Sequence, residues 1–186
     1  MTPYSFDNLR HALEEELSVI LTELSRDLDN YGFALDVPKD YGSACLLYTI
    51  GKESTLDSKD DKSKRKSKLK SLQALDNRYS PVEWMENWLW LPQSNNILKK
   101  LVDDFSADYQ KTKNKNLQGK MHDEFITSCA SACLDVLKEC NSAGLFGNIW
   151  YKIVVMSDEE HPIVAEAFRT LNSGRAIDEA ATVLFG

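Results

Sequence analysis

Apolar residues recur every three or four positions in several segments of the chain, and this spacing predicts amphipathic helices. The longest are residues 5–28, 95–109 and 117–141, and two helices of about ten residues follow residue 161. The apolar stripe of the first helix consists of Leu9, Leu13, Leu17, Ile20, Leu21, Leu24 and Leu28. The neighbouring glutamates fall largely off this stripe, so the helix is expected to bury one face only.

Three apolar runs of strand length lie between these helices, at residues 33–37, 44–50 and 148–156. Residues 38–42 (PKDYG) separate the first two runs, and a loop of this length is typical of an antiparallel hairpin. The pattern therefore predicts an α+β fold in which several amphipathic helices pack against a mainly antiparallel sheet. No repeat or linker divides the chain, so residues 1–186 are expected to form a single domain.

Residues 77–90 contain three of the four tryptophans and a helix-start signal. Ser80 can cap the first amides of a helix, Pro81 suits the first helical position, and Glu83 can bond back to the cap. Trp84 and Trp88 would then lie one turn apart on one face, where each can bury a large area. This stretch is predicted to hold the fold together.

The amino-acid composition is that of a globular protein, with 42% hydrophobic and 27% charged residues. No apolar run approaches the roughly 18 residues that a membrane-spanning helix needs, so a membrane partner is not expected. The N-terminus shows no basic segment followed by an apolar one. We therefore expect the protein in the cytoplasm. Cys129, Cys133 and Cys140 share one helical face and are interpreted as buried apolar residues, not as a disulfide or a metal site.

The net charge of −7 is unevenly distributed, because two acidic ends flank a basic middle. The balance is −7 over residues 1–58, +6 over residues 59–120 and −6 over residues 121–186. Much of the basic charge lies at about residues 52–70, a segment without apolar periodicity that we interpret as a solvent-exposed insertion or loop. Weak nucleic-acid binding through residues 62–70 is the alternative, but no aromatic residues interleave there to stack on bases.

Signals for catalysis are absent from the sequence. His11, His122 and His161 lie far apart, no glycine-rich phosphate loop occurs, and no Gly-x-Ser-x-Gly turn is present. No second ligand cluster accompanies any histidine, so we predict no metal site, no cofactor and no catalytic residues. A site dispersed over the fold stays open as an alternative.

Several short motifs follow one another along the chain. The central motif is Arg78-Tyr79-Ser80-Pro81-Val82-Glu83-Trp84, and Trp88 follows four residues after Trp84. The flanking motifs, in chain order, are Phe33-Ala34-Leu35, Gly144-Leu145-Phe146-Gly147, Met156-Ser157-Asp158 and Leu171-Asn172. In this order the motifs resemble a bacterial family of unknown function, domain-of-unknown-function 4303. The likeness covers most of the chain apart from the basic insertion, and Ser173 stands where members tend to have proline.

This resemblance implies an α+β domain and supplies no active site. Small cytoplasmic proteins of this kind are often encoded beside secreted toxins as immunity proteins. The leading hypothesis is therefore an immunity protein that binds and occludes a cognate toxin, with acidic surfaces that steer a basic partner. The candidate contacts are Glu14, Glu15, Glu16, Asp158, Glu159 and Glu160. The alternatives are an uncharacterised enzyme, or a small-molecule-binding domain built around Tyr79, Trp84 and Trp88.

Overall fold

A computed structural model describes residues 4–42, 44–55, 78–84, 88–156 and 161–184 of the chain. Outside residues 77–90, the predicted helices and strands are all present, with shifted ends. The helices are α1 (Asp7–Leu24), α4 (Pro92–Lys111), α5 (Lys115–Ser142), α6 (Pro162–Leu171) and α7 (Arg175–Leu184). The strands are β1 (Asn30–Asp36), β2 (Leu47–Lys52), β3 (Leu89–Trp90) and β4 (Tyr151–Val155), and a 3-10 helix, η1 (Pro81–Trp84), precedes β3.

The four strands form one mixed sheet in the order β3-β2-β1-β4. β1 pairs antiparallel with β2, as the predicted hairpin required, and β2 pairs antiparallel with β3. β4 lies parallel to β1, with Ala34 opposite Ile153. A parallel neighbour needs a long crossover, which here contains α4 and α5. The predicted α+β fold is confirmed.

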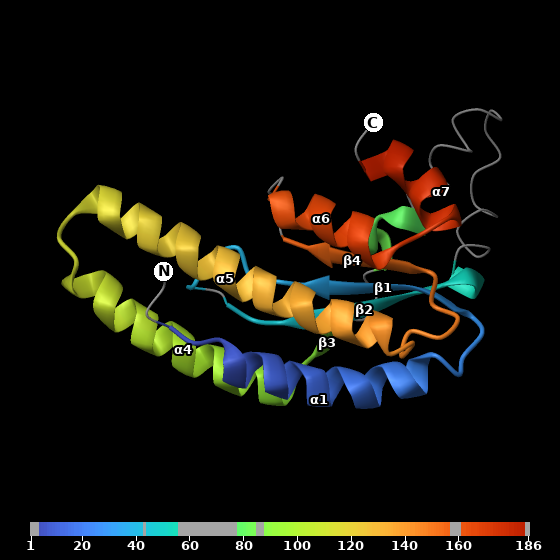
Figure 1. The fold of residues 1–186 in the computed structure, drawn as a ribbon, viewed down its shortest axis with the longest axis horizontal. Coiled ribbons are helices and arrows are strands. Elements are labelled where there is room, and N and C mark those ends of the chain that lie inside the picture. The colour runs from blue at the N-terminus through green and yellow to red at the C-terminus, as the bar shows by residue number, and fades with distance from the viewer. Residues whose placement is uncertain (1–3, 43, 56–77, 85–87, 157–160, 185–186) are drawn as a thin grey trace.

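One face of the sheet is covered by α1, α4 and α5 (Figure 1). The leucines of α1 at positions 9, 13, 17 and 21 are fully buried in this core, as their spacing predicted. Phe33 and Leu35 of β1 point into the same core from the sheet. Cys129, Cys133 and Cys140 are also buried there, which confirms their interpretation as apolar residues of α5.

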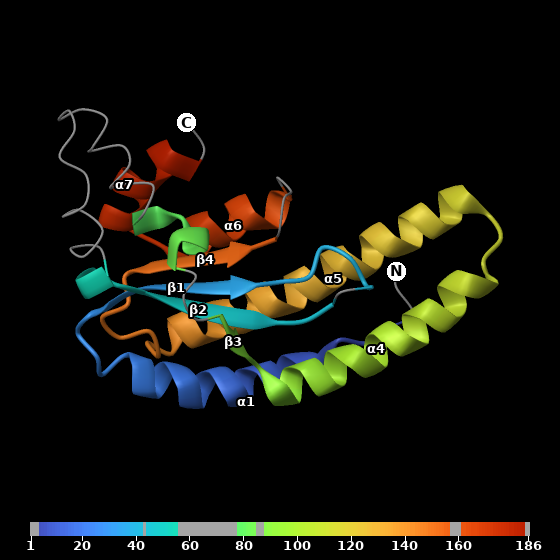
Figure 2. The same cartoon turned by 180° about the vertical axis from the view of Figure 1, so that it is seen from behind.

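The other face carries a second, aromatic core at one end of the sheet, where η1, α6 and α7 lie (Figure 2). Trp84 packs directly on a pair of glycines, Gly32 of β1 and Gly51 of β2, which lie opposite each other in the register. A Cβ atom at Gly32 would lie 2.5 Å from the Trp84 ring, and one at Gly51 would lie 2.9 Å from it. Glycine is therefore required at both positions for the indole to reach the sheet.

The first helix ends earlier than predicted, at Leu24, and Leu28 is 85% exposed. The reason lies in the start of β1. Asn30 is buried in the sheet, and its side-chain amide donates to the carbonyl of Leu24 at 2.9 Å. This bond takes up a carbonyl at the end of the helix. The chain must then turn between Leu24 and Asn30, and Leu28 lies on the outside of that turn.

The predicted α-helix after Ser80 is wrong, because the described part of this stretch is the short 3-10 helix η1. Trp88 precedes β3 outside any helix, so Trp84 and Trp88 do not share a helical face. Both nevertheless pack in the aromatic core, Trp84 as a buried member and Trp88 partly buried against it. Contacts with the sheet, which the local pattern does not contain, override the capping signal here.

Two asparagines hold the sheet to its helices through the same set of bonds. Asn95 of α4 accepts from the N–H of Leu46 at 2.7 Å and donates to the carbonyls of Leu46 and Leu91. Asn172, which follows α6, accepts from the N–H of Lys152 at 2.7 Å and donates to the carbonyls of Lys152 and Phe168. Each side chain thus pairs with the N–H and C=O of one residue as a neighbouring strand would, at Leu46 just before β2 and at Lys152 of β4. In β4 these bonds occupy the outer edge of the sheet at Lys152.

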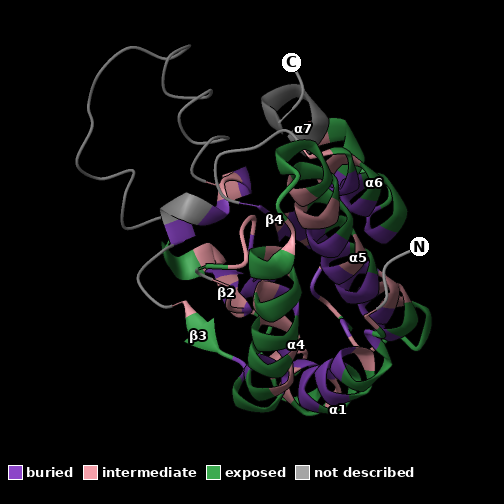
Figure 3. Ribbon diagram, turned by 90° about the vertical axis from the view of Figure 1, so that its left-hand side faces the viewer, coloured by how far each residue is buried: buried purple, intermediate pink, exposed green. Residues whose placement is uncertain are grey.

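Burial varies sharply across the molecule (Figure 3). The sheet-facing sides of α1 and α5 are buried, whereas β3, at the edge of the sheet, is exposed at both positions. Within the described ranges, no helix is long and apolar enough to cross a membrane.

Candidate functional site

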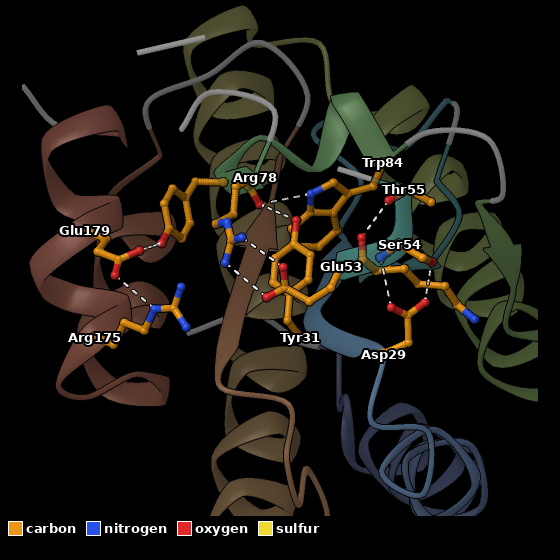
Figure 4. A network of polar contacts seen from close by, with 11 residues as sticks. Asp29, Tyr31, Glu53, Ser54, Thr55, Arg78, Trp84, Arg175 and Glu179 are labelled. Carbon is orange, nitrogen blue, oxygen red and sulfur yellow. Dashed lines mark hydrogen bonds and ion pairs between the residues drawn. The ribbon is translucent and has the colours of Figure 1, made fainter. Parts of the chain in front are cut away.

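The central motif places a network of polar and aromatic side chains beside the aromatic core (Figure 4). Arg78 forms two hydrogen bonds with the carboxylate of Glu53, at 3.0 and 2.8 Å. Its backbone carbonyl accepts from the Tyr31 hydroxyl at 2.7 Å and from the Trp84 indole at 3.1 Å. The motif is therefore bonded to both β1 and the end of β2.

Stacked cations and rings connect this network to α7. The Arg78 guanidinium lies over the ring of Tyr31, 5.4 Å from its centroid, and the Trp150 ring lies 5.8 Å from the same ring. The Arg175 guanidinium lies over Trp150 at 4.4 Å. Cation–ring contacts of this kind are worth about 0.5–2 kcal/mol each, depending on burial. Arg78 and Arg175 therefore flank an aromatic pair.

Tyr79 is fully buried, and its hydroxyl donates to Glu179 of α7. Glu179 also accepts from Arg175 at 2.9 Å. The Tyr79 carbonyl in turn accepts from the Tyr151 hydroxyl at 2.7 Å. Burial, followed by the hydrogen bond to Glu179, raises the pKa of Tyr79 above its ordinary value. A phenol that resists ionisation does not act as a base or nucleophile near neutral pH, so this arrangement favours a structural role.

The remaining motif residues lie around this network. Ser80 is partly buried between Tyr79 and η1, and Pro81 begins η1. The indole N–H of Trp88 is buried without a hydrogen-bond partner in the described part of the chain. The side chain of Glu83 lies outside the described residues, so its predicted capping bond stays a prediction.

The acidic residues predicted to bind a partner are described only on α1. Glu14 and Glu15 are exposed on α1, and the carboxylate of Glu15 lies 3.4 Å from His11. Asp158, Glu159 and Glu160 lie outside the described residues.

Glu16 lies inside the fold and not on its surface. It is 8% exposed, and its carboxylate accepts from the N–H of Gln93 at 2.8 Å and from the N–H of Ser94 at 2.9 Å. The Ser94 hydroxyl donates to it as well, at 2.5 Å. These amides are at the start of α4, where a helix leaves N–H groups unsatisfied and favours negative charge. Glu16 therefore caps α4. Of the three candidate residues on α1, Glu14 and Glu15 are the exposed ones.

Sequence reasoning missed Asp36, the last residue of β1. Burial raises the pKa of its carboxyl from 3.8 to about 6. Cys45 lies close enough that the charge of Asp36, after burial, contributes to a raised pKa of its thiol. A carboxylate ending an apolar strand (Phe33-Ala34-Leu35-Asp36) was the available signal. Asp36 can exchange a proton near neutral pH, which is the property of a general acid or base.

Asp36→Asn is expected to increase stability more at neutral than at acidic pH. The folded-state pKa is raised, so the contribution of Asp36 to stability is complete below pH 3.8 and is lost as the pH rises through about 6. Asparagine has no such loss. After discounting for partial solvation, the free energy of unfolding of the variant relative to the wild type should rise by about 1 kcal/mol from pH 4 to pH 7. Urea unfolding at both pH values measures this, and a pH-independent difference would contradict it.

The other sequence-based expectations concern metal, cofactor and basic-segment chemistry. Among the described residues, no group of three or more His, Cys, Asp or Glu side chains is arranged to hold a metal ion. Lys52, where the basic segment was predicted to begin, is the last residue of β2, and its ammonium pairs with Asp27 at 3.1 Å. Residues 56–70 of that segment lie outside the described part of the chain.

Comparison with known proteins identifies the family. The family described as "Domain of unknown function (DUF4303)" matches residues 11–173, from α1 to the residues that follow α6. No curated protein and no solved structure matches the chain. The matched range contains the whole sheet, the two glycines beneath Trp84 and the central motif. Because this match spans most of its length, the chain belongs to the DUF4303 family.

Proposed function

We propose that the protein is a cytoplasmic immunity protein that binds a cognate bacterial toxin and occludes it. The observation that carries this proposal is the exposed face of α1. Glu14 and Glu15 are exposed there, and Val19, one turn after Glu15, is 63% exposed. A helix that presents carboxylates beside an apolar side chain suits a basic protein partner, because complementary charge accelerates the encounter and apolar contact retains the partner.

The central motif supports a binding function in preference to a catalytic one. The guanidinium of Arg78 is occupied by Glu53, and the hydroxyl of Tyr79 is occupied by Glu179. Each of these two groups is thus bonded to a carboxylate of the protein itself. The pKa of Tyr79 is raised by burial, whereas the pKa of an activated nucleophile is lowered. The motif therefore holds the fold, and the proposed partner is met elsewhere, on α1.

The proposal is tested with the product of the adjacent gene, produced in a catalytically inactive form. We expect the two purified proteins to form a complex, and co-expression to protect cells from the active form. Replacing Glu14 and Glu15 with lysine should slow association about tenfold at low salt and reduce its dependence on ionic strength. Surface plasmon resonance measures both effects.

The matched control carries the same change in net charge at other sites. Asp103→Lys on α4 combined with Asp178→Lys on α7 reverses two exposed carboxylates on other helices. The control variant should associate at nearly the wild-type rate. Equal slowing of both variants would show that net charge, and not the α1 face, governs the encounter. No complex and no protection with the true genomic neighbour would refute the immunity function.

A further inference from the structure

Three large apolar side chains are exposed on α1 and on β3, the edge strand of the sheet. Glu16 of α1 accepts from the N–H of Gln93, three residues after β3, so α1 passes close to this edge. Val19 of α1 is 63% exposed, and Leu89 and Trp90 of β3 are 45% and 56% exposed. β3 is the outermost strand beyond β2, and Figure 3 shows its ribbon exposed at that edge. The opposite edge differs, because Asn172 occupies the outer side of β4 at Lys152. An exposed tryptophan on a strand that has no second neighbour among the described strands needs an explanation.

Tyr48 of β2 lies between Leu89 and α1 on one face of the sheet. It lies opposite Leu89 in the β2–β3 register, so the two side chains are on the same face of the sheet. The carboxylate of Glu23, one turn after Val19 on α1, lies near its phenol, since burial and then the charge of Glu23 raise the pKa of Tyr48. Figure 2 shows α1 continuing beneath the sheet past the point where α4 begins. We call Val19, Glu23, Tyr48, Leu89 and Trp90 the edge surface.

The arrangement of the edge surface is that of a protein interface. Leu89 and Trp90 are consecutive in a strand, so they point to opposite faces and the surface wraps around the edge. Tryptophan is the side chain most enriched at interface positions that dominate affinity. Its ring also accepts a lysine or arginine cation on its face. Glu23 and the nearby Glu15 add a carboxylate border, so the surface is apolar with a negative border.

We propose that the edge surface is the site at which the basic partner docks, with Trp90 as its anchor. This inference rests on the proposed function and names the interface and the chemistry of the partner: cationic side chains around an apolar one. Charge argues against a second copy of the chain as the occupant. In a twofold dimer the same patch lies on both sides, so the carboxylates of Glu15 and Glu23 would meet a surface that has carboxylates and no cation of its own among the residues that define it. Like charges placed together in this way oppose association.

The test uses isothermal titration calorimetry with the full chain and the inactive product of the adjacent gene. Trp90→Ala should weaken binding about thirtyfold, the effect of removing an interface anchor. Leu89→Ser should weaken it less, by about tenfold. The matched control is Leu117→Ala at the start of α5, since Leu117 is 49% exposed but distant from β3 along the long axis. Circular dichroism and the melting temperature verify that every variant stays folded.

The possible outcomes separate this inference from the proposed function. If the wild-type chain does not bind the product, the proposed function fails and the inference fails with it. If the wild type binds and Trp90→Ala and Leu89→Ser bind equally tightly, the partner docks elsewhere and only the edge surface is refuted. If the wild type alone is a dimer that Trp90→Ala dissociates, a second copy is the occupant and the inference is overturned. Loss of affinity in both edge variants, with Leu117→Ala unchanged, supports it.

Discussion

Trp84→Ala is expected to lower the free energy of unfolding by about 4 kcal/mol, the cost of removing a buried large aromatic side chain. Trp84 is 9% exposed, and its ring lies in edge contact with Tyr31 and Tyr151, at centroid distances of 5.6 and 5.7 Å. The sheet beneath it cannot fill the space, because Gly32 and Gly51 have no side chains. Removing the indole therefore leaves a cavity and also leaves the Arg78 carbonyl with one donor fewer. Urea unfolding followed by circular dichroism measures the loss.

A matched control comes from the same stretch of chain. Trp90→Ala removes an identical side chain that is 56% exposed, and its expected cost is within about 0.5 kcal/mol. Similar losses in the two variants would show that burial on the glycine pair is not what makes Trp84 important. The comparison also bears on binding, because we expect Trp84 to matter for stability and Trp90 for the partner.

Glu16→Ala is expected to cost about 3 kcal/mol, which is large for a residue in a run of glutamates. Its carboxylate accepts three hydrogen bonds from Gln93 and Ser94 at the start of α4. Alanine leaves two backbone N–H groups without their acceptor, and the Ser94 amide and hydroxyl are in the buried part of the structure. It also removes a negative charge from the positive end of a helix. Chemical unfolding at neutral pH measures the effect.

Glu15→Ala is the natural comparison, since it removes the same side chain from the adjacent position. Glu15 is exposed, so its replacement should change stability by no more than about 0.5 kcal/mol. If Glu16→Ala were as mild as Glu15→Ala, the cap on α4 would not be a significant source of stability. If both were equally harmful, the loss would come from the helix and not from the α4 contact.

Local patterns in the sequence were sufficient to predict the elements and the α+β fold. The leucine stripe of α1 and the hairpin of β1 and β2 depend on residues a few positions apart. The burial of Cys129, Cys133 and Cys140 follows from helical spacing in the same way. Periodicity reports these features because a helix or strand places neighbouring residues on fixed faces, whatever it packs against.

The candidate functional features depend on contacts between distant parts of the chain. We predicted Glu16 to be exposed like its neighbouring glutamates, although helical spacing places it beside Leu9 and Leu13. The start of α4, 77 residues away, makes it a buried cap. The helix predicted after Ser80 became a 3-10 helix, because Trp84 is held on Gly32 and Gly51 of the sheet. The edge surface joins α1, β2 and β3, which only long-range pairing brings together.

The family motif illustrates the same division. Its residues are recognisable in sequence, and in the structure they bond to Glu53, Tyr31 and Glu179. Which partners they would find could not be inferred from spacing, because these partners lie 25, 47 and 100 residues away in the chain. Helix and strand formation is local, so the sequence pattern reveals it. The Glu16 cap, the packing of Trp84 on two glycines and the exposure of Trp90 are properties of the tertiary structure. They depend on which residues from distant parts of the chain come into contact, and these contacts determine the free energy of folding.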